Sequence, residues 1–336
     1  MKEAKFYEKC KDNRVRCFLC NHRCLISEGE RGICRVRENR GGVLYSLIYG
    51  KLVSQHVDPI EKKPFFHFFP GSTAYSVATV GCNFKCDFCQ NYEISQIVRD
   101  HNQIWGEEYS PEEIVDLALN YGCQSISYTY TEPTIAYDYY REIMRLAKDK
   151  GLYNNFVTNG YMTEEMLKDA QGYLDAANVD LKSFNEDFYK KICGAKLEKV
   201  LETLKIMKDM HIWVEVTTLI IPGFNDSEEE IRKCAEFVYS LGKETPWHVS
   251  RFYPHYRMNN VTYTPISTLK KARKIGLEVG LKYVYTGNIP GDEGENTFCY
   301  NCKRVLIRRY GFEVLEYNIE NSQCKFCQAL IEGIGL

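Results

Sequence analysis

The chain has 336 residues, of which 26% are charged, and its formal net charge of −2 is close to neutral. This balance excludes nucleic acid and an anionic membrane surface as main partners, because both attract strongly basic proteins. The first ten residues, MKEAKFYEKC, lack the apolar core of a signal peptide. No stretch approaches the roughly 18 apolar residues of a membrane span. We therefore expect a cytoplasmic protein with one large α/β domain and small additions.

Fifteen cysteines are a high number for such a chain, and eleven of them fall into three closely spaced groups. In a reducing compartment, close spacing favours metal binding over disulfides. The other four are isolated, and we expect them to be small buried hydrophobic residues. The three groups are Cys17, Cys20, Cys24 and Cys34; Cys82, Cys86 and Cys89; and Cys299, Cys302, Cys324 and Cys327.

The groups divide the chain into three expected parts: a Cys-rich N-terminal region (1–70), a core of alternating strands and helices (71–290), and a short tail (291–336). The N-terminal region has a strand-like run at 43–54 and the first cysteine group, spaced C-x2-C-x3-C with a fourth cysteine after nine residues. This group has two interpretations. It holds an auxiliary iron–sulfur cluster for electron relay, or it holds a structural zinc or no metal.

The core alternates apolar, β-prone runs with helical windows, and Ser110-Pro111 is a typical helix start. Such repeated βα units predict a parallel sheet with helices outside it. About six or seven strands are too few for a complete eight-stranded barrel, so we expect a partial, TIM-like (β/α)6 barrel with its chemistry at the carboxyl ends of the strands. Strands are expected at 74–80, 125–130, 155–158, 176–182, 214–221, 247–253 and 282–286. Helices are expected at 111–122, up to 150, and near 163–174, 196–210, 227–241 and 267–280.

The loop GCNFKCDFCQN directly follows the first core strand and contains the second cysteine group in a C-x3-C-x2-C pattern. Three thiolates at this spacing can surround one cubane iron–sulfur cluster, whereas ferredoxin patterns supply four. One iron would then be open to a ligand that is not a protein side chain. The alternatives are a zinc knuckle or three structural thiols.

Polar residues follow the next strands at corresponding points. They are the segments TYTEP (129–133), TNG (158–160), DLK (180–182) and YPH (253–255). Each segment alone is weak evidence, because a polar residue in a βα loop is commonly a solvated residue or a helix cap. Together, and behind the three-cysteine loop, they predict a ligand pocket at the carboxyl edge of the sheet.

The tail contains two C-x2-C pairs separated by 21 residues, with two β-like runs between them. Two knuckles joined by a hairpin are typical of a zinc ribbon, and the four thiolates would be tetrahedral ligands. Zinc is favoured here over a rubredoxin-like iron. A tail this short needs such a staple to fold.

The three-cysteine loop resembles that of radical S-adenosylmethionine (SAM) enzymes. The core is similar to the branch that includes pyruvate formate-lyase activating enzyme. In that branch a Gly-Gly-Glu-Pro-like segment holds the amino group of SAM; here Glu132 and Pro133 are kept, but Tyr130 and Thr131 replace the glycines. The resemblance implies that SAM chelates the open iron of a [4Fe–4S] cluster bound by the second cysteine group. It implies that these residues line the SAM pocket: Thr131, Glu132, Asn159, Asp180, Lys182 and His255.

The pattern over nearly the whole chain is most similar to the group named AmmeMemoRadiSam system radical SAM enzymes. The matching segments are 17–39, 58–72, the cysteine loop and 284–302. The resemblance implies an oxidoreductase, working anaerobically, that cleaves SAM to a 5′-deoxyadenosyl radical. It also implies a reductant such as flavodoxin or ferredoxin and an association with Memo-like and AMMECR-like proteins.

The activating-enzyme resemblance favours a glycine of a partner protein as the group that loses hydrogen. The first alternative is a small molecule or another protein side chain as substrate. A second alternative, of a different class, is a non-catalytic iron–sulfur electron carrier or scaffold. The aromatic segment around Phe65–Phe69 has two interpretations: a seam between the N-terminal region and the core, which is favoured, or a cover over the cluster.

Overall fold

The computed structural model describes residues 1–336 and is built around one eight-stranded sheet. Its strand order is β16-β15-β14-β13-β12-β11-β9-β8, and all neighbours are parallel except β8 and β9. The strands are β8 (Ser54–Pro59), β9 (Thr73–Ala78), β11 (Ser125–Tyr128), β12 (Tyr153–Thr158), β13 (Ala176–Asp180), β14 (Trp213–Ile220), β15 (Trp247–Arg251) and β16 (Val284–Gly287). The parallel strands match the expected ones, which confirms the α/β architecture.

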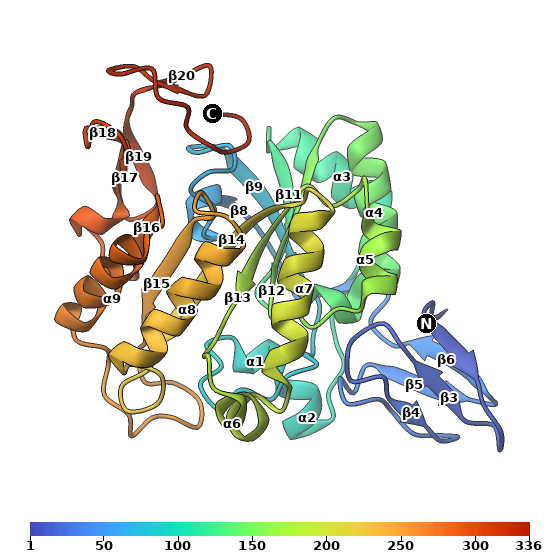
Figure 1. Ribbon diagram of the computed structural model, residues 1–336. Helices are drawn as coiled ribbons and strands as arrows, with labels where there is room; N and C mark the ends of the chain where they lie inside the picture. The colour runs from blue at the N-terminus through green and yellow to red at the C-terminus, as the bar shows by residue number, and fades with distance from the viewer.

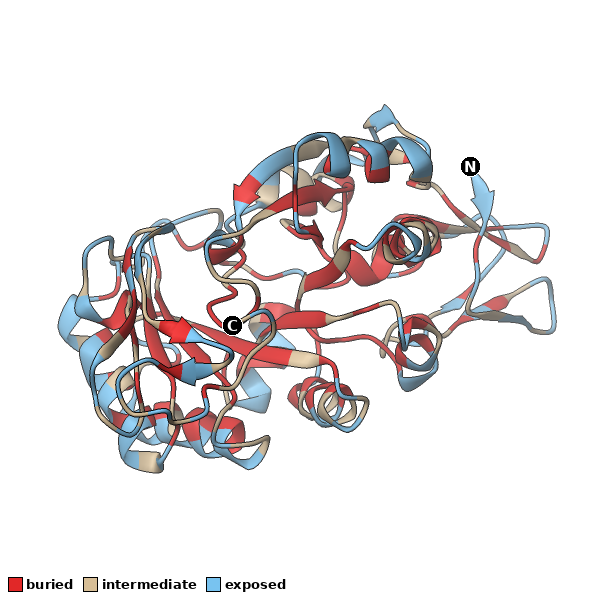
Figure 2. Ribbon diagram, turned by 90° about the horizontal axis from the view of Figure 1, so that it is seen from above, coloured by how far each residue is buried: buried red, intermediate tan, exposed pale blue.

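Helices lie outside this sheet, and Figure 2 shows that the strands are buried while each helix exposes one face. The longer helices are α3 (Pro111–Asn120), α4 (Tyr137–Asp149), α5 (Glu164–Ala170), α7 (Leu197–Asp209), α8 (Glu228–Ser240) and α9 (Ile266–Val279). Ser110 caps α3 and forms a capping box with Glu113, as its sequence predicts. The short helices are α1 (Tyr92–Ser95), α2 (Ile97–His101), α6 (Glu186–Phe188), η1 (Ile60–Lys62), η2 (Pro133–Ala136), the π-helical turn η3 (Tyr189–Cys193) and η4 (Glu293–Glu295). No helix combines the length and the apolar character needed to cross a bilayer.

The N-terminal region consists of two small sheets beside the central one, drawn in blue in Figure 1. Its strands are β1 (Lys2–Glu3), β2 (Tyr7–Lys9), β3 (Val15–Cys17), β4 (Leu25–Ile26), β5 (Arg37–Arg40), β6 (Val43–Ser46) and β7 (Lys51–Leu52), which pairs with β10 (Glu107–Glu108). The run expected as one strand at 43–54 is broken, because Gly50 adopts a φ of 77° between β6 and β7.

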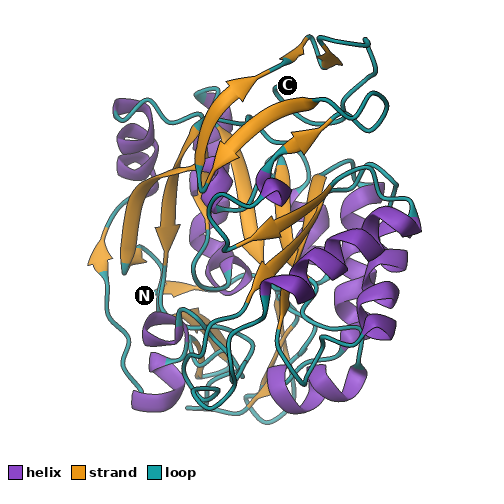
Figure 3. Cartoon of the chain, turned by 90° about the vertical axis from the view of Figure 1, so that its left-hand side faces the viewer, coloured by secondary structure: helices purple, strands orange, loops and turns teal.

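The C-terminal segment is a ribbon of short antiparallel strands, which lies at the top of Figure 3. Its strands are β17 (Thr297–Phe298), β18 (Val305–Tyr310), β19 (Glu313–Tyr317), β20 (Ile319–Glu320) and β21 (Gln323–Cys324). Arg309 of β18 is fully buried; it pairs with Glu61 and donates to the carbonyl oxygen of Phe66 at 3.1 Å. Glu61 and Phe66 follow β8, which is one edge strand of the central sheet. The ribbon follows β16, which is the other edge strand. The contacts of Arg309 therefore connect the two edges of the open barrel.

The aromatic segment packs against the core and the ribbon. Phe65 and Phe68 lie in one buried cluster with Ala74 and Ala176, at the amino ends of β9 and β13. Phe66 contacts the ring of Tyr285, with centroids 4.7 Å apart, and belongs to the apolar cluster of the ribbon. The rings therefore pack the end of the N-terminal region (1–70) against the amino end of the sheet, which agrees with the favoured interpretation of a seam with the core.

Candidate functional site

A cavity of about 460 Å³ opens at the carboxyl ends of the parallel strands. It brings together the three-cysteine loop and most of the polar segments that the sequence places after successive strands. The predicted residues that line it are Cys82, Cys86, Cys89, Thr131, Glu132, Asn159, Asp180 and Lys182. These residues, up to 100 positions apart in the sequence, meet here because every parallel strand ends at the same edge of the sheet.

Hydrogen-bond donors surround the thiols of the cysteine loop. The backbone N–H of Phe84 points at Cys82 Sγ at 3.4 Å, and the amide nitrogen of Asn159 lies 3.8 Å from the same sulfur. Ser95 Oγ lies 2.9 Å from Cys89 Sγ. Burial raises the pKa of Cys82 and Cys89, so these thiols are neutral until a bound cation removes their protons.

Cys86 has a neighbour that its sequence position does not reveal. The side chain of Cys193, expected to be an isolated hydrophobic residue, hydrogen-bonds to Cys86, and this contact together with burial raises the pKa of the Cys86 thiol. Cys193 does not line the cavity, so only three thiols face it. These three sulfurs are not gathered within 4.8 Å of one another. Such a wide set of donors fits a cluster of several irons better than one ion.

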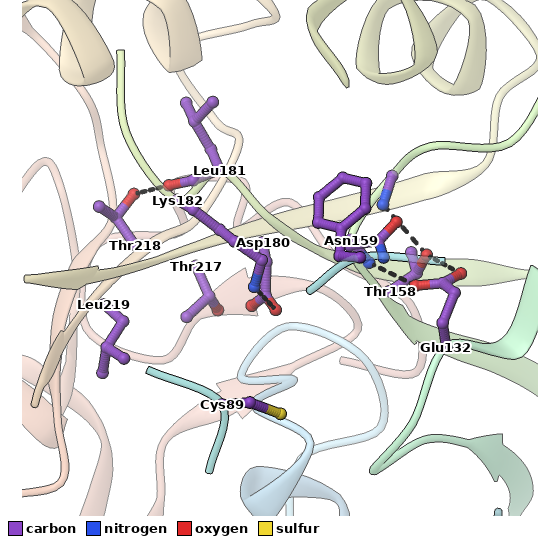
Figure 4. A network of polar contacts seen from close by, with 12 residues as sticks. Cys89, Glu132, Thr158, Asn159, Asp180, Leu181, Lys182, Thr217, Thr218 and Leu219 are labelled. Carbon is purple, nitrogen blue, oxygen red and sulfur yellow. Dashed lines mark hydrogen bonds and ion pairs between the residues drawn. The ribbon is translucent and has the colours of Figure 1, made fainter. Parts of the chain in front are cut away.

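Glu132 is a buried carboxylate that fixes two neighbouring loops. Its Oε1 accepts from the N–H of Thr134 at 3.0 Å, and from the hydroxyl groups of Thr134 and Thr158. Its Oε2 accepts only the N–H of Asn159, at 2.8 Å. Burial raises the pKa of this carboxyl group, whereas the four donors lower it. Oε2 therefore has acceptor capacity left beside the cysteine loop (Figure 4).

Asp180 and Lys182 lie together at the end of β13, where the Lys182 ammonium contacts Asp180 Oδ2 at 2.8 Å (Figure 4). The same ammonium lies 5.5 Å from the ring centre of Phe88, between two of the cysteines. Burial lowers the pKa of Lys182, but the charges of Asp180 and Cys86 outweigh it, and the net shift is upward. Lys182 is thus a fixed positive charge beside the thiols.

The last two predicted pocket residues have different surroundings. Thr131 lines the cavity, and its hydroxyl donates to the carbonyl oxygen of Thr79 at 2.8 Å. His255 is exposed, packs against the ring of Tyr92 at 5.2 Å, and does not line the cavity.

Sequence reasoning missed a buried acid–base pair on the wall of the cavity. His248 of β15 lines the cavity, and its Nε2 lies 2.7 Å from Glu215 Oε2 of β14. Glu215 is fully buried and also accepts from the backbone N–H groups of Phe66 and His67. Burial raises the pKa of Glu215, but the hydrogen bond and charge of His248, the charge of His67 and the N–H of Phe66 together outweigh it, so the net shift is downward. Both residues lie inside strands, where the sequence pattern predicts packing rather than chemistry.

The C-terminal cysteine group forms a compact site. The sulfurs of Cys299, Cys302, Cys324 and Cys327 all lie within 4.8 Å of one another. Cys299 and Cys327 are 3.6 Å apart, and Cys302 and Cys324 are 3.8 Å apart. These separations suit a tetrahedral ion with metal–sulfur bonds of about 2.3 Å, as for zinc. The predicted four-cysteine site is therefore present in the ribbon.

Comparisons with known proteins agree with this geometry. Residues 76–238 match the family model of the radical SAM superfamily. An uncharacterized protein of Methanocaldococcus jannaschii is 50% identical over 335 residues, which is 99% of each chain. The pyruvate formate-lyase-activating enzyme of Clostridium pasteurianum is 24% identical over 217 residues, covering 60% of this chain and 87% of that enzyme. The crystal structure of a radical SAM methyltransferase from Sphaerobacter thermophilus shares the fold, with a TM-score of 0.52, 14% identity and coverage of 68% and 71%.

Proposed function

This chain belongs to the radical SAM superfamily, and we propose that it cleaves SAM reductively and removes a hydrogen atom from a glycine of a partner protein. The superfamily uses a [4Fe–4S] cluster and SAM, which together supply a one-electron cleavage to a 5′-deoxyadenosyl radical. The observation that carries the proposal is one cavity lined by three thiols, a carboxylate with free acceptor capacity and a fixed ammonium group.

In this proposal Cys82, Cys86 and Cys89 hold the cluster, and the N–H of Phe84 and the amide of Asn159 stabilise its charge by donating to Cys82 Sγ. The C-x3-C-x2-C loop supplies no fourth thiolate, so one iron is open to SAM.

Glu132 is the proposed acceptor for the amino group of SAM, through Oε2. Asp180 and Lys182 lie on the opposite wall, where Lys182 suits the carboxylate of SAM and Asp180 suits a hydroxyl group. Thr131 and Asn159 shape the same wall as Glu132. His255 is exposed, so its proposed contact with the ribose or carboxylate of SAM requires a shift of the loop after β15.

The partner glycine is proposed because a pyruvate formate-lyase-activating enzyme matches most of its own length to this chain. We extend the proposal to the AmmeMemoRadiSam group, with flavodoxin or ferredoxin as reductant and Memo-like or AMMECR-like proteins as partners. A small molecule or another protein side chain is the alternative substrate. A glycyl radical detected by electron paramagnetic resonance (EPR) on a co-expressed partner supports the first choice; a modified small molecule in its place supports the second.

The decisive experiment measures 5′-deoxyadenosine by mass spectrometry in anaerobically reconstituted protein supplied with SAM and dithionite. We expect the wild type to release 5′-deoxyadenosine, and so should the control variant Cys10→Ser, because Cys10 lies outside all three cysteine groups. The triple variant that combines Cys82→Ala, Cys86→Ala and Cys89→Ala should release none. Release by the triple variant would contradict the cluster assignment. No release by wild type with a loaded cluster, even in the presence of the co-expressed partner, would favour the electron-carrier alternative.

The role of Glu132 has its own test. Glu132→Gln keeps an acceptor oxygen but loses the charge, so iron content should not change. We expect SAM to bind about tenfold or more weakly, because a charge-assisted hydrogen bond contributes roughly 1.5–3 kcal/mol. The measurement is a SAM titration followed by the EPR signal of the reduced cluster. Unchanged SAM binding would remove Glu132 from the site.

A further inference from the structure

The four N-terminal cysteines come together around one small cavity at the edge of the core. Cys17 lies at the end of β3, Cys20 and Cys24 lie in the loop before β4, and Cys34 lies shortly before β5. Apolar side chains complete the lining, among them Ile26, Ile33 and, from the core, Ile135. Four thiols facing one apolar cavity are unusual in a reduced protein unless they bind a metal group.

The sulfurs of the N-terminal group, like those of the cysteine loop, are less tightly gathered than those of the ribbon. The ribbon sulfurs all lie within 4.8 Å of one another, but neither the N-terminal four nor the three of the loop form such a group. A single zinc with bonds of about 2.3 Å needs the tight arrangement. A cluster places iron and sulfide between its thiolates and needs the wider one.

The N-terminal sulfurs also receive hydrogen bonds suited to an anionic group. The backbone N–H of Ile33 donates to Cys24 Sγ at 3.5 Å, and Arg37 Nη1 donates to Cys17 Sγ at 3.4 Å. Arg37 is buried and pairs with Asp138 at the start of α4, so its guanidinium group is held in place beside the sulfur. Hydrogen bonds to thiolate sulfur stabilise a cluster and set its reduction potential.

The segments that carry the N-terminal cysteines are bonded to the cysteine loop of the core through Arg99 and His22. Arg99 Nη2 donates to the carbonyl oxygen of Ile33, next to Cys34, at 3.3 Å and to that of Cys82 at 3.4 Å. His22, between Cys20 and Cys24, bonds through Nε2 to the carbonyl oxygen of Asn83 at 2.9 Å.

Gly81 allows this close approach, because a Cβ there would lie 2.9 Å from a methyl group of Val36 and 3.5 Å from the carbonyl oxygen of Cys34. The main chains that carry the two sets of thiols are thus separated by one side chain or less.

We propose that Cys17, Cys20, Cys24 and Cys34 hold a second [4Fe–4S] cluster, which relays electrons to the cluster of the SAM site. The second cluster takes one electron from a reduced flavodoxin or ferredoxin, which is oxidised. It then returns to its resting state by passing that electron to the SAM-site cluster through the Arg99 and His22 contacts. The binding of the second cluster is independent of the proposed function, whereas the relay rests on it.

The binding test uses the full chain, reconstituted anaerobically with iron and sulfide, and measures iron, sulfide and zinc together with Mössbauer spectra. We expect about eight irons in cubane clusters for the wild type and for Cys10→Ser, and about four for Cys82→Ala, Cys86→Ala, Cys89→Ala. The Cys20→Ser, Cys24→Ser variant should also retain about four, now at the SAM site. A triple variant with no cubane iron, or with zinc in the N-terminal site, would overturn the proposal even if the double variant does not fold.

The relay test compares two electron donors on the Cys20→Ser, Cys24→Ser variant. Dithionite is small and should still reduce the SAM-site cluster, whose EPR signal should still change when SAM is added, which shows that the site is intact. Reduction by flavodoxin or ferredoxin should be lost. If flavodoxin or ferredoxin reduces this variant as fast as the wild type, the proposed electron relay is wrong, but the proposed binding of the second cluster is not affected. If the triple variant keeps its cluster and the wild type releases no 5′-deoxyadenosine, only the proposed function fails.

Discussion

The two four-cysteine regions are attached to the core in the same way but differ at their sulfurs. Each has one buried arginine that pairs with a carboxylate of the core: Arg37 with Asp138 in the N-terminal region, and Arg309 with Glu61 in the ribbon. Figure 1 shows the two regions at opposite ends of the molecule. The ribbon sulfurs are gathered for one ion, whereas the N-terminal sulfurs are spread around a cavity.

The difference lies in what each cysteine group touches. Arg309 bonds to the core and to its own ribbon through Thr297, and to none of the cysteines. Arg37 donates directly to Cys17, and the N-terminal loops reach the cysteine loop of the core. Four thiols therefore suit a different role in each region. In the ribbon they suit a structural metal ion that holds the ribbon together, and in the N-terminal region they suit a metal group next to the three-cysteine loop. The following predictions test this contrast, from the largest effect to the smallest.

The largest effect is expected from Cys324→Ser. A structural zinc in a small unit contributes on the order of 10 kcal/mol to its folding, so the ribbon should unfold when one ligand is lost. Zinc should disappear while the cubane iron remains. Metal analysis and hydrogen exchange over residues 297–336 measure both results. Retained protection in this range without bound metal would show that the ribbon does not need a staple.

Arg309→Met and Arg37→Met should each lower the free energy of unfolding by about 3–5 kcal/mol, because each leaves a buried carboxylate without its partner. Their side effects should differ. Only Arg37→Met removes a donor to a cysteine sulfur, so only this variant should shift the reduction potential of the N-terminal cluster. Denaturant unfolding and EPR redox titration measure the two effects. The contrast fails if Arg309→Met shifts the same potential.

Protonation of His67, which lies between the ribbon and the core, should lower the free energy of unfolding at acid pH. Burial lowers the pKa of His67 to about 4, while the charge of Glu215 opposes this shift; the ring bonds to Tyr285 and to the carbonyl oxygen of Glu332. In the unfolded state the pKa of His67 is near 6.5, so as the pH falls the unfolded chain binds the proton before the folded protein does. The contribution of neutral His67 to the free energy of unfolding is therefore complete above pH 6.5 and is lost as the pH falls toward 4.

The expected loss is about 3 kcal/mol over this range, measured by denaturant unfolding at several pH values. Acid protonation of Glu215, whose pKa is lowered, adds to the loss at the lower end. His67→Gln is the control and should flatten the dependence between pH 6.5 and 4. An equally steep dependence in this variant would assign the effect to other groups.

The smallest effect is expected from Arg23→Ala. Arg23 pairs with Glu165 of α5 at 2.8 Å, but both side chains are about half exposed. Exposed pairs contribute roughly 0–1 kcal/mol, so the unfolding free energy should change by less than about 1 kcal/mol. Iron content should not change. This variant is the exposed counterpart of Arg37→Met, and a loss as large as that of Arg37→Met would show that α5 is a main anchor of the N-terminal region.

Much of the fold and the center of the site follow from local sequence patterns. The βα alternation predicted the parallel strands, and the C-x3-C-x2-C loop lies at the edge where those strands end. The aromatic segment forms a seam with the core, but the sequence alone does not show that its rings cover the amino end of the sheet. Likewise the sequence position of His248 inside a strand does not distinguish a cavity wall from a packed interior.

The sequence by itself determined what depends on neighbours along the chain: the cysteine spacings, the helix start at Ser110 and the polar turn after each strand. Only the tertiary structure decided which distant groups meet. Arg99 joins Ile33 to Cys82, and Arg309 joins the ribbon to Glu61. Spacing along the chain fixes distances within a turn or a loop, whereas contacts between remote segments depend on how strands and helices pack. For this reason, two four-cysteine groups that both permitted zinc in the sequence differ in the folded protein.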